Sequence, residues 1–150
     1  FEISVAAFPE KHPESKSFED DIAYLKKKID AGATRAITQY FFDVEHYFRF
    51  IDLARKNRIT IPIVPGILPI GNFTQVKKFS AMCGASIPDW LAQKFEPLEN
   101  DVEARSQAAV ETAATQCRKL IAFGCEHLHF YTLNRADLTT EIVKGVGHRV

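Results

Sequence analysis

The chain has 150 residues, a length typical of one compact domain, with a hydrophobic share of 46% and a charged share of 25% as in ordinary globular proteins. Lysine plus arginine and aspartate plus glutamate balance at 19 each, so no excess charge attracts nucleic acid or an anionic membrane. No apolar run approaches the roughly 20 residues that span a bilayer. Composition therefore excludes a disordered tail and a fibre, and predicts no nucleic-acid or membrane partner.

The cysteines indicate a reducing environment. Cys83, Cys117 and Cys125 are odd in number and have no CxxC spacing, which favours free thiols that we interpret as small apolar side chains. The first residues, from Phe1 on, carry no secretory or transit signal. We therefore expect a cytoplasmic globular protein.

Strand-like and helix-like segments alternate along the chain. Ser17 is a good helix N-cap, and Phe18, Ile22, Leu25 and Ile29 follow it at helical spacing. The same unit of a strand and a capped helix then repeats. In chain order we expect strands at 2–7, 35–42, 61–67 and 127–133, helices that begin at the caps Ser17, Asp43, Asn72 and Asn100, and two more helices at 87–95 and 136–146.

Strands joined through helices by short connections indicate βαβ units and a parallel sheet in one domain. Four such units are half of the eight in a closed (β/α)8 barrel, which takes about 250 residues. No strand is followed by a Gly-rich phosphate-binding turn of the dinucleotide-binding or P-loop type. The pattern leaves two architectures open: a small open sheet, such as a four-stranded doubly wound one, or half of a larger fold.

Polar residues at the carboxyl ends of the predicted strands are binding-site candidates, because parallel α/β folds bind ligands there. Gln39 lies at an otherwise apolar strand end, where its amide either bonds a neighbouring backbone group or offers a donor and an acceptor to a heterocycle. Arg135 follows the last strand and either clamps a carboxylate or lies on the surface. Phe79 follows Gln75 by one helical turn and shares its face.

The first predicted helix carries Asp21, Tyr24 and Lys28 on one face, with Lys27 beside them. Such a lysine run is most often a solvated stripe. A functional interpretation needs a phosphate-bearing ligand along this helix, which His12 of the preceding loop would also contact. Together the candidate residues indicate a large, partly aromatic and partly anionic ligand, without naming a reaction.

A metal site is not expected. His127 and His129 alternate on the fourth predicted strand and share a face. No third ligand has suitable spacing, whereas zinc sites usually take three or four protein ligands.

Five segments, taken together, resemble the methylenetetrahydrofolate reductase family, the flavin enzymes of one-carbon metabolism. The resemblance covers nearly the whole chain in the family's order and spacing. The segments are Glu2–Glu10 with His12-Pro13, Asp30–Ala33, Ile37–Asp43, Pro65–Pro69 and Phe130–Arg135.

The resemblance implies a (β/α)8 TIM barrel of which this chain holds the last four βα units, so that residues 1–150 are the carboxyl-terminal half of one barrel domain. It implies reduction of 5,10-methylenetetrahydrofolate to 5-methyltetrahydrofolate, with hydride from NADH or NADPH passed through non-covalent FAD. The residues that it assigns to the folate are Gln39, which would also lie near the nicotinamide, Gln75, Phe79, Leu133 and Arg135. The residues that it assigns to the FAD are Phe8, His12, Ser15, Asp21, Tyr24, Lys27 and Lys28.

Three of the FAD residues depart from the family's pattern. Phe8 stands where the family can carry tyrosine, and so lacks a phenolic hydrogen bond. Lys27 replaces what can be arginine, and offers a point charge in place of a planar fork. Tyr24 stands where an amide is expected, and would stack on the adenine instead.

The resemblance also implies that the acidic proton donor lies upstream, so no catalytic acid is expected within these residues. We expect the chain to be a fragment that is poorly stable and inactive alone, because half a barrel exposes two sheet edges. The complete protein is expected to be a homo-oligomer. Two alternatives stay open: a non-catalytic folate- or flavin-binding half-barrel that acts with a partner chain, and a stand-alone small α/β binding protein.

Overall fold

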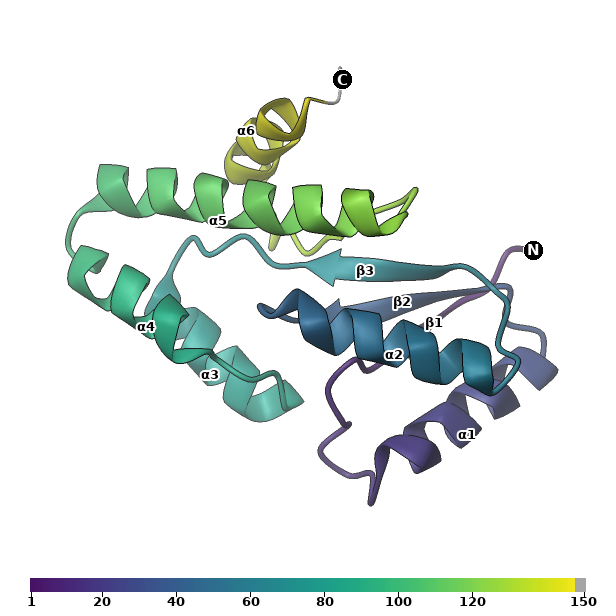
Figure 1. Cartoon of the computed structure of the whole chain (residues 1–150). Helices are drawn as coiled ribbons and strands as arrows, with labels where there is room; N and C mark the ends of the chain where they lie inside the picture. The colour runs from purple at the N-terminus through teal and green to yellow at the C-terminus, as the bar shows by residue number, and fades with distance from the viewer. Residues whose placement is uncertain (148–150) are drawn as a thin grey trace.

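A computed structural model describes residues 1–147 and contains four parallel strands that alternate with helices (Figure 1). The strands are β1 (Ser4–Ala7), β2 (Arg35–Tyr40), β3 (Ile63–Ile67) and β4 (His129–Phe130). The helices are α1 (Phe18–Asp30), α2 (Val44–Lys56), α3 (Phe73–Cys83), α4 (Asp89–Phe95), α5 (Val102–Phe123) and α6 (Ala136–Val146), with a 3-10 turn, η1 (Glu96–Leu98). None of the helices in this part of the chain has the length and apolar character to cross a membrane.

Three of the four predicted helix caps are confirmed. The side chains of Ser17, Asp43 and Asn72 each accept a hydrogen bond from a backbone N–H in the first turn of α1, α2 and α3. The fourth prediction, Asn100, is wrong by one residue. The cap of α5 is Asp101, whose carboxylate accepts from the backbone N–H three residues on.

Several element bounds differ from the prediction. The strand expected at 127–133 is reduced to His129–Phe130, because only these two residues are in register with β3. The strands expected at 2–7, 35–42 and 61–67 each lose two residues at one end. The helix expected at 87–95 begins at Asp89, because Pro88 before it has an extended backbone.

The main core lies between one face of the sheet and the helices. Ala7, Ala36, Ile63 and Ile67 are buried on β1, β2 and β3. They belong to one apolar cluster with side chains of α1, α2, α5 and α6. These four helices therefore cover the same face of the sheet.

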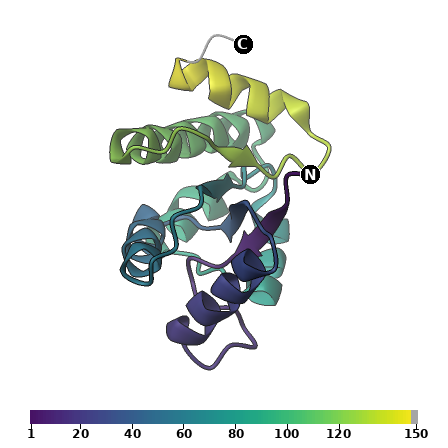
Figure 2. The ribbon, with the colours of Figure 1, turned by 90° about the vertical axis from the view of Figure 1, so that its right-hand side faces the viewer.

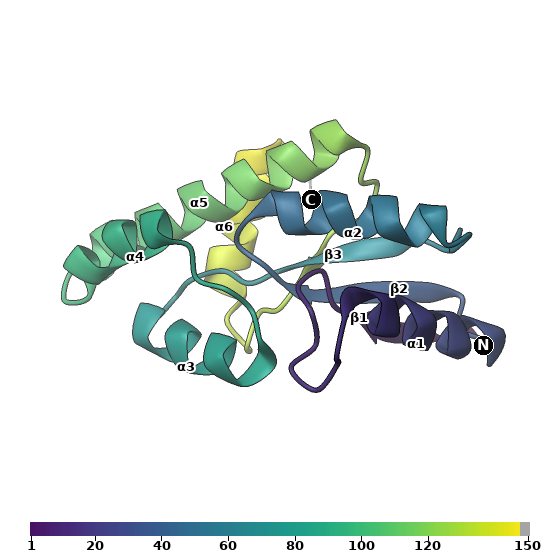
Figure 3. The same ribbon diagram turned by 60° about the horizontal axis from the view of Figure 1, so that its bottom comes forward.

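The sheet order is β1-β2-β3-β4, so each strand pairs with the next one along the chain. Figures 1 and 3 show α2 between α1 and α5 beside the strands, and Figure 2 shows α1 and α6 at opposite ends of the molecule. A doubly wound sheet reverses its order at a switch point, and this sheet does not. The architecture therefore resembles part of a TIM barrel, and the sheet is open at β1 and β4 within the described residues.

A second core lies beyond the carboxyl ends of the strands, where α3 and α4 are seen in Figure 1. Tyr40 and Leu68, which end or follow β2 and β3, pack there with Phe73 and Val76 of α3 and with Phe95 of α4. This core fixes α3 against the edge of the sheet at which parallel α/β folds bind ligands.

β2 and β3 lose their regular register between Ile37 and Tyr40. The buried Thr38 links the strands there with two hydrogen bonds. Its Oγ1 accepts one from the backbone N–H of Gly66 at 2.9 Å, and its carbonyl accepts one from the Tyr131 hydroxyl at 2.8 Å. A Cβ on Gly66 would collide with the Thr38 carbonyl oxygen and lie 2.6 Å from a Tyr131 ring carbon. The close approach of β3 to β2 therefore requires glycine at position 66. The hydrogen bond from Tyr131 to Thr38 joins the end of β4 to β2.

Candidate functional site

The first cavity lies at the carboxyl end of β1, against α1, and measures about 480 Å³. We call it the β1 cavity. Its lining includes six of the seven residues predicted to contact FAD, namely Phe8, His12, Ser15, Asp21, Tyr24 and Lys28. The seventh, Lys27, is exposed on α1 and is not part of the lining. The structure thus gathers residues from a loop and a helix, while their role in FAD binding stays a prediction.

Asp21 holds the loop between β1 and α1 in place. Its carboxylate accepts hydrogen bonds from the backbone N–H of His12 at 2.9 Å and from the Ser15 hydroxyl. His12 Nδ1 accepts from the backbone N–H of Glu14 at 3.1 Å, so the neutral ring carries its proton on Nε2. The same ring stands edge-on to Phe8, with centroids 4.5 Å apart. The loop is therefore preorganised, with a donor at His12 Nε2.

Lys28 adds a half-buried cation to the β1 cavity. Its Nζ donates to the carbonyl of Ala6 at 2.9 Å and lies 4.9 Å from the centroid of the Tyr24 ring. Burial lowers the pKa of Lys28, and the Asp21 carboxylate opposes this shift. An ammonium group has three donors, so two remain for a ligand such as a phosphate.

A second cavity, of about 100 Å³, lies where β3 and β4 end, against α3 and α6. We call it the β4 cavity. Its lining includes four of the five residues predicted to contact folate, namely Gln75, Phe79, Leu133 and Arg135. Two of them come from α3 and are one helical turn apart, and two come from the turn between β4 and α6.

The turn after β4 has an uncommon backbone conformation. Leu133 and Asn134 have φ angles of 49° and 61°, in the left-handed region that leucine rarely adopts. The turn brings the Arg135 guanidinium close to Gly71, where an added Cβ would lie 3.1 Å from Nη1. No ion pair of Arg135 occurs among residues 1–147. Its charge is therefore available to an anion.

Gln39, the fifth predicted folate residue, lines neither cavity. It is half-buried and alternates along β2 with the buried Ala36 and Thr38, so it lies on the sheet face that the helices leave open. Its Oε1 accepts a hydrogen bond from the backbone N–H of Tyr40 at 3.0 Å, as the structural alternative expected. This bond uses one of the two lone pairs of the amide oxygen and leaves the NH2 group without a hydrogen bond to residues 1–147, so the NH2 group could meet a ligand.

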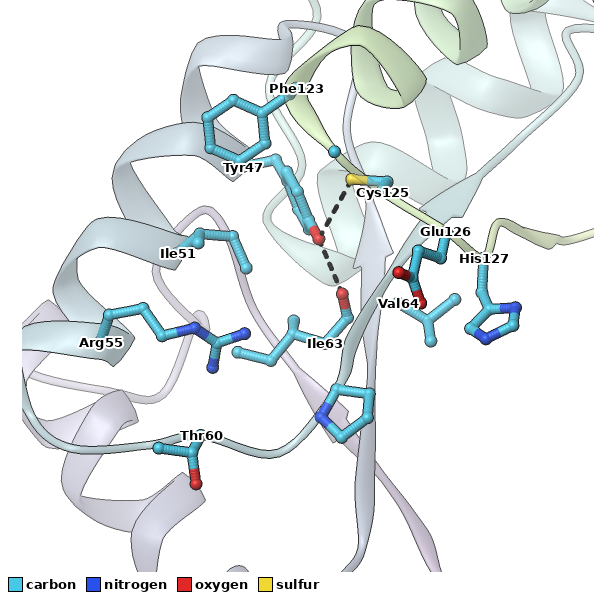
Figure 4. Close-up of a pocket in the computed structure, with 12 residues that line it drawn as sticks. Tyr47, Ile51, Arg55, Thr60, Ile63, Val64, Phe123, Cys125, Glu126 and His127 are labelled. Carbon is cyan, nitrogen blue, oxygen red and sulfur yellow. Dashed lines mark hydrogen bonds between the residues drawn. The ribbon is translucent and has the colours of Figure 1, made fainter.

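A third cavity, of about 350 Å³, lies at the amino-terminal end of β3 (Figure 4). The Tyr47 hydroxyl there donates to the carbonyl of Ile63 at 2.7 Å, and the Cys125 thiol donates to the Tyr47 oxygen at 3.5 Å. Burial raises the pKa of both Tyr47 and Cys125, which keeps both groups neutral. His127 lines this cavity and His129 lies in β4, yet residues 1–147 hold no group of three side chains suited to a metal ion.

Both candidate cavities include residues that the sequence did not single out as contacts. Glu14 and Phe50 line the β1 cavity, and Gly71 and Asn72 line the β4 cavity. Asn72 was recognisable as a helix cap and Glu14 as part of the loop after β1. Phe50 reaches the β1 cavity from α2, so only the packing of α2 on α1 reveals it.

Comparison with known proteins gives the chain's relatives. Residues 1–147 match the family model described as methylenetetrahydrofolate reductase. The 5,10-methylenetetrahydrofolate reductase of Escherichia coli (strain K12) is 49% identical over 149 residues, which cover 99% of this chain and 50% of the relative. That of Buchnera aphidicola subsp. Acyrthosiphon pisum (strain APS) is 48% identical over 147 residues, which cover 98% of this chain and 50% of the relative. The chain thus spans about half the length of the curated relatives it matches.

A solved structure has the same arrangement of elements. It is the structure of an uncharacterized protein from Clostridium thermocellum that binds two copies of 5-methyl-5,6,7,8-tetrahydrofolic acid. The TM-score is 0.62 at 19% identity, over 98% of this chain and 53% of that one, so the likeness is one of fold. The family match over residues 1–147 shows that the chain belongs to the methylenetetrahydrofolate reductase family.

Proposed function

We propose that the chain is half of the catalytic barrel of an FAD-dependent methylenetetrahydrofolate reductase, which reduces 5,10-methylenetetrahydrofolate to 5-methyltetrahydrofolate with hydride from NADH or NADPH. The observation that carries the proposal is the gathering of two predicted residue sets around two cavities at one edge of the sheet, six at the β1 cavity and four at the β4 cavity. The family match supports the same reaction.

The β1 cavity suits a ligand such as FAD, which is both aromatic and anionic. Lys28 supplies a cation with free donors for a phosphate, and burial reduces the competition from water for it. Tyr24 is 61% exposed, so part of its ring is open to stacking with a base beside the Lys28 ammonium. Asp21 is already satisfied by two donors of the loop, so its negative charge is partly screened from a phosphate.

The β4 cavity, of about 100 Å³, has a lining suited to one part of an extended aromatic carboxylate such as folate. The Arg135 guanidinium is a planar fork that matches a carboxylate group. Phe79 supplies an aromatic face and Gln75 an amide, both from the rigid helix α3. Gln39, on the open face of β2, offers its NH2 group to the heterocycle.

When bound, FAD would supply the redox chemistry by accepting two electrons and a proton as hydride equivalent and then delivering them. The residues of this chain bind and orient the two ligands, and the β1–α1 loop is preorganised for this by Asp21. No acid of this chain is assigned to protonation of the folate, and the proposal assigns that role to a residue outside it.

The test uses the full-length protein that carries this sequence, purified and loaded with FAD. NADH or NADPH should bleach the flavin absorbance without oxygen, and 5,10-methylenetetrahydrofolate should then restore it. Flavin that is reduced but never reoxidised by the folate would contradict the proposal. Binding of folate or flavin without any reduction would instead support the alternative of a non-catalytic binding half-barrel.

We also propose that further βα units of the full-length protein close the open sheet into a barrel. β1 and β4 are edges of the sheet within the described residues, and four further βα units would pair with both. Association into a homo-oligomer and a cytoplasmic location belong to the same proposal. The three free cysteines support a reducing compartment.

A further inference from the structure

We infer that Tyr40 is a positioning residue for folate, since it links the three elements that carry the predicted folate residues. This inference rests on the proposed function and deepens it. The family resemblance assigns no role to Tyr40. It ends β2 directly after Gln39, it is buried, and it belongs to the core beneath α3.

The hydroxyl of Tyr40 links β2 to α3. It lies 3.1 Å from Ser80 Oγ, which is also buried, and it accepts a hydrogen bond from the Cys83 thiol at 3.4 Å. Ser80 directly follows Phe79 and lies five residues after Gln75 on the same helix. The contact therefore sets how far α3, with both folate candidates, stands from the end of β2.

The ring of Tyr40 links the same point to β4. It packs edge-on to the Tyr131 ring, with centroids 6.3 Å apart. Tyr131 is itself fixed, because its hydroxyl donates to the Thr38 carbonyl of β2 at 2.8 Å. Leu133 follows two residues later, at the start of the strained turn that leads to Arg135. Tyr40 thus contacts Ser80, next to the α3 side of the β4 cavity, and Tyr131, just before the turn that forms its other side.

Tyr40 acts through its hydrogen bonds and its packing. Burial and the bond from Cys83 raise its pKa, so the hydroxyl stays neutral throughout the physiological range. A neutral hydroxyl can both donate and accept, so Tyr40 accepts from Cys83 while it either donates to or accepts from Ser80. Tyr40 is absent from the lining of the β4 cavity, so it touches no ligand there and positions those residues that do.

The chain holds a matched control at the other end of the sheet. Tyr47 is a second buried tyrosine whose hydroxyl accepts from a cysteine, Cys125, and donates within the core (Figure 4). It lines the third cavity and neither candidate site. Tyr47→Phe removes the same hydroxyl at a similar burial, so it reports the general cost of that loss.

The experiment measures steady-state kinetics and FAD retention in the full-length, FAD-loaded protein. Tyr40→Phe and Ser80→Ala should each raise KM for 5,10-methylenetetrahydrofolate by about three- to tenfold, the scale of one hydrogen bond. The double variant should lose no more than Tyr40→Phe alone, because both substitutions remove the bond between Tyr40 and Ser80. FAD retention should not change, since neither residue lines the β1 cavity. Tyr47→Phe should leave KM for the folate unchanged.

Three results would overturn the inference: an unchanged KM in both single variants, an equal rise in Tyr47→Phe, or additive effects in the double variant. Use of Ser80→Ala beside Tyr40→Phe keeps the test decisive if one variant does not fold. A wild-type protein that turns over no folate would refute the proposed function, and this role with it. Normal wild-type turnover with unchanged variants would refute this role alone.

Discussion

Replacing Gly66 by alanine should destabilise the protein far more than adding one methyl group usually does. The new Cβ would collide with the Thr38 carbonyl oxygen and lie 2.6 Å from the Tyr131 ring. Both neighbours are fixed, because Thr38 also accepts the backbone N–H of Gly66 and the Tyr131 hydroxyl. Overpacking costs about 1–3 kcal/mol, and loss of each hydrogen bond costs about 1 kcal/mol more. We expect a loss of about 3–5 kcal/mol, a large share of the stability of a typical domain.

Urea unfolding of the full-length protein that carries this sequence measures this loss, with Gly145→Ala as the control. Gly145 lies in α6, and its added Cβ would meet only Ala114 at an ordinary 3.7 Å. Alanine is the better helix former, so this variant should gain up to about 1 kcal/mol. If Gly66→Ala unfolds at the same urea concentration as Gly145→Ala with an unchanged slope, the close packing of β2, β3 and Tyr131 is refuted.

Three further predictions follow from the caps, the cation and the open sheet. Lys28→Met should weaken FAD binding about tenfold by fluorescence titration, while the exposed Lys27→Met should not; equal losses would contradict the distinction between these lysines. Asp101→Ala should cost about 1 kcal/mol in urea unfolding and Asn100→Ala almost nothing, because only Asp101 caps α5; the reverse order would contradict the cap. The 150-residue chain expressed alone should aggregate or unfold at low urea, since β1 and β4 are edges; a stable monomer that retains FAD would be the contrary result.

Local chemistry was sufficient to predict all six helices and the starts of four of them. Ser17, Asp43 and Asn72 could be identified as caps because a cap is satisfied within its own first turn. The error at the start of α5 arose where Asn100 and Asp101, two good caps, are adjacent. In the structure a turn after the 3-10 helix bonds the backbone N–H of Asp101 to the Leu98 carbonyl, and Asp101 caps α5.

Tertiary contacts decided what the sequence could not. Helical spacing placed Lys28 on one face with Tyr24 and Lys27 beside it, but the resemblance assigned both lysines to FAD; the packing of α1 on β1 shows that Lys28 reaches the Ala6 carbonyl. The expected strand at 127–133 is likewise shortened to β4, because only His129 and Phe130 pair with β3. The bond between Tyr40 and Ser80 joins residues 40 positions apart, and no periodicity in the chain indicates it.

The central claim is that FAD and folate meet at the carboxyl edge of this sheet, each at its own set of residues. A crystal structure of the full-length protein with FAD and 5-methyltetrahydrofolate tests it most directly. We predict FAD within hydrogen-bond distance of Lys28 and His12 in the β1 cavity, and folate in contact with Gln75, Phe79 and Arg135 in the β4 cavity. Either ligand bound at the amino-terminal end of the strands, or in contact with none of these residues, would contradict the account.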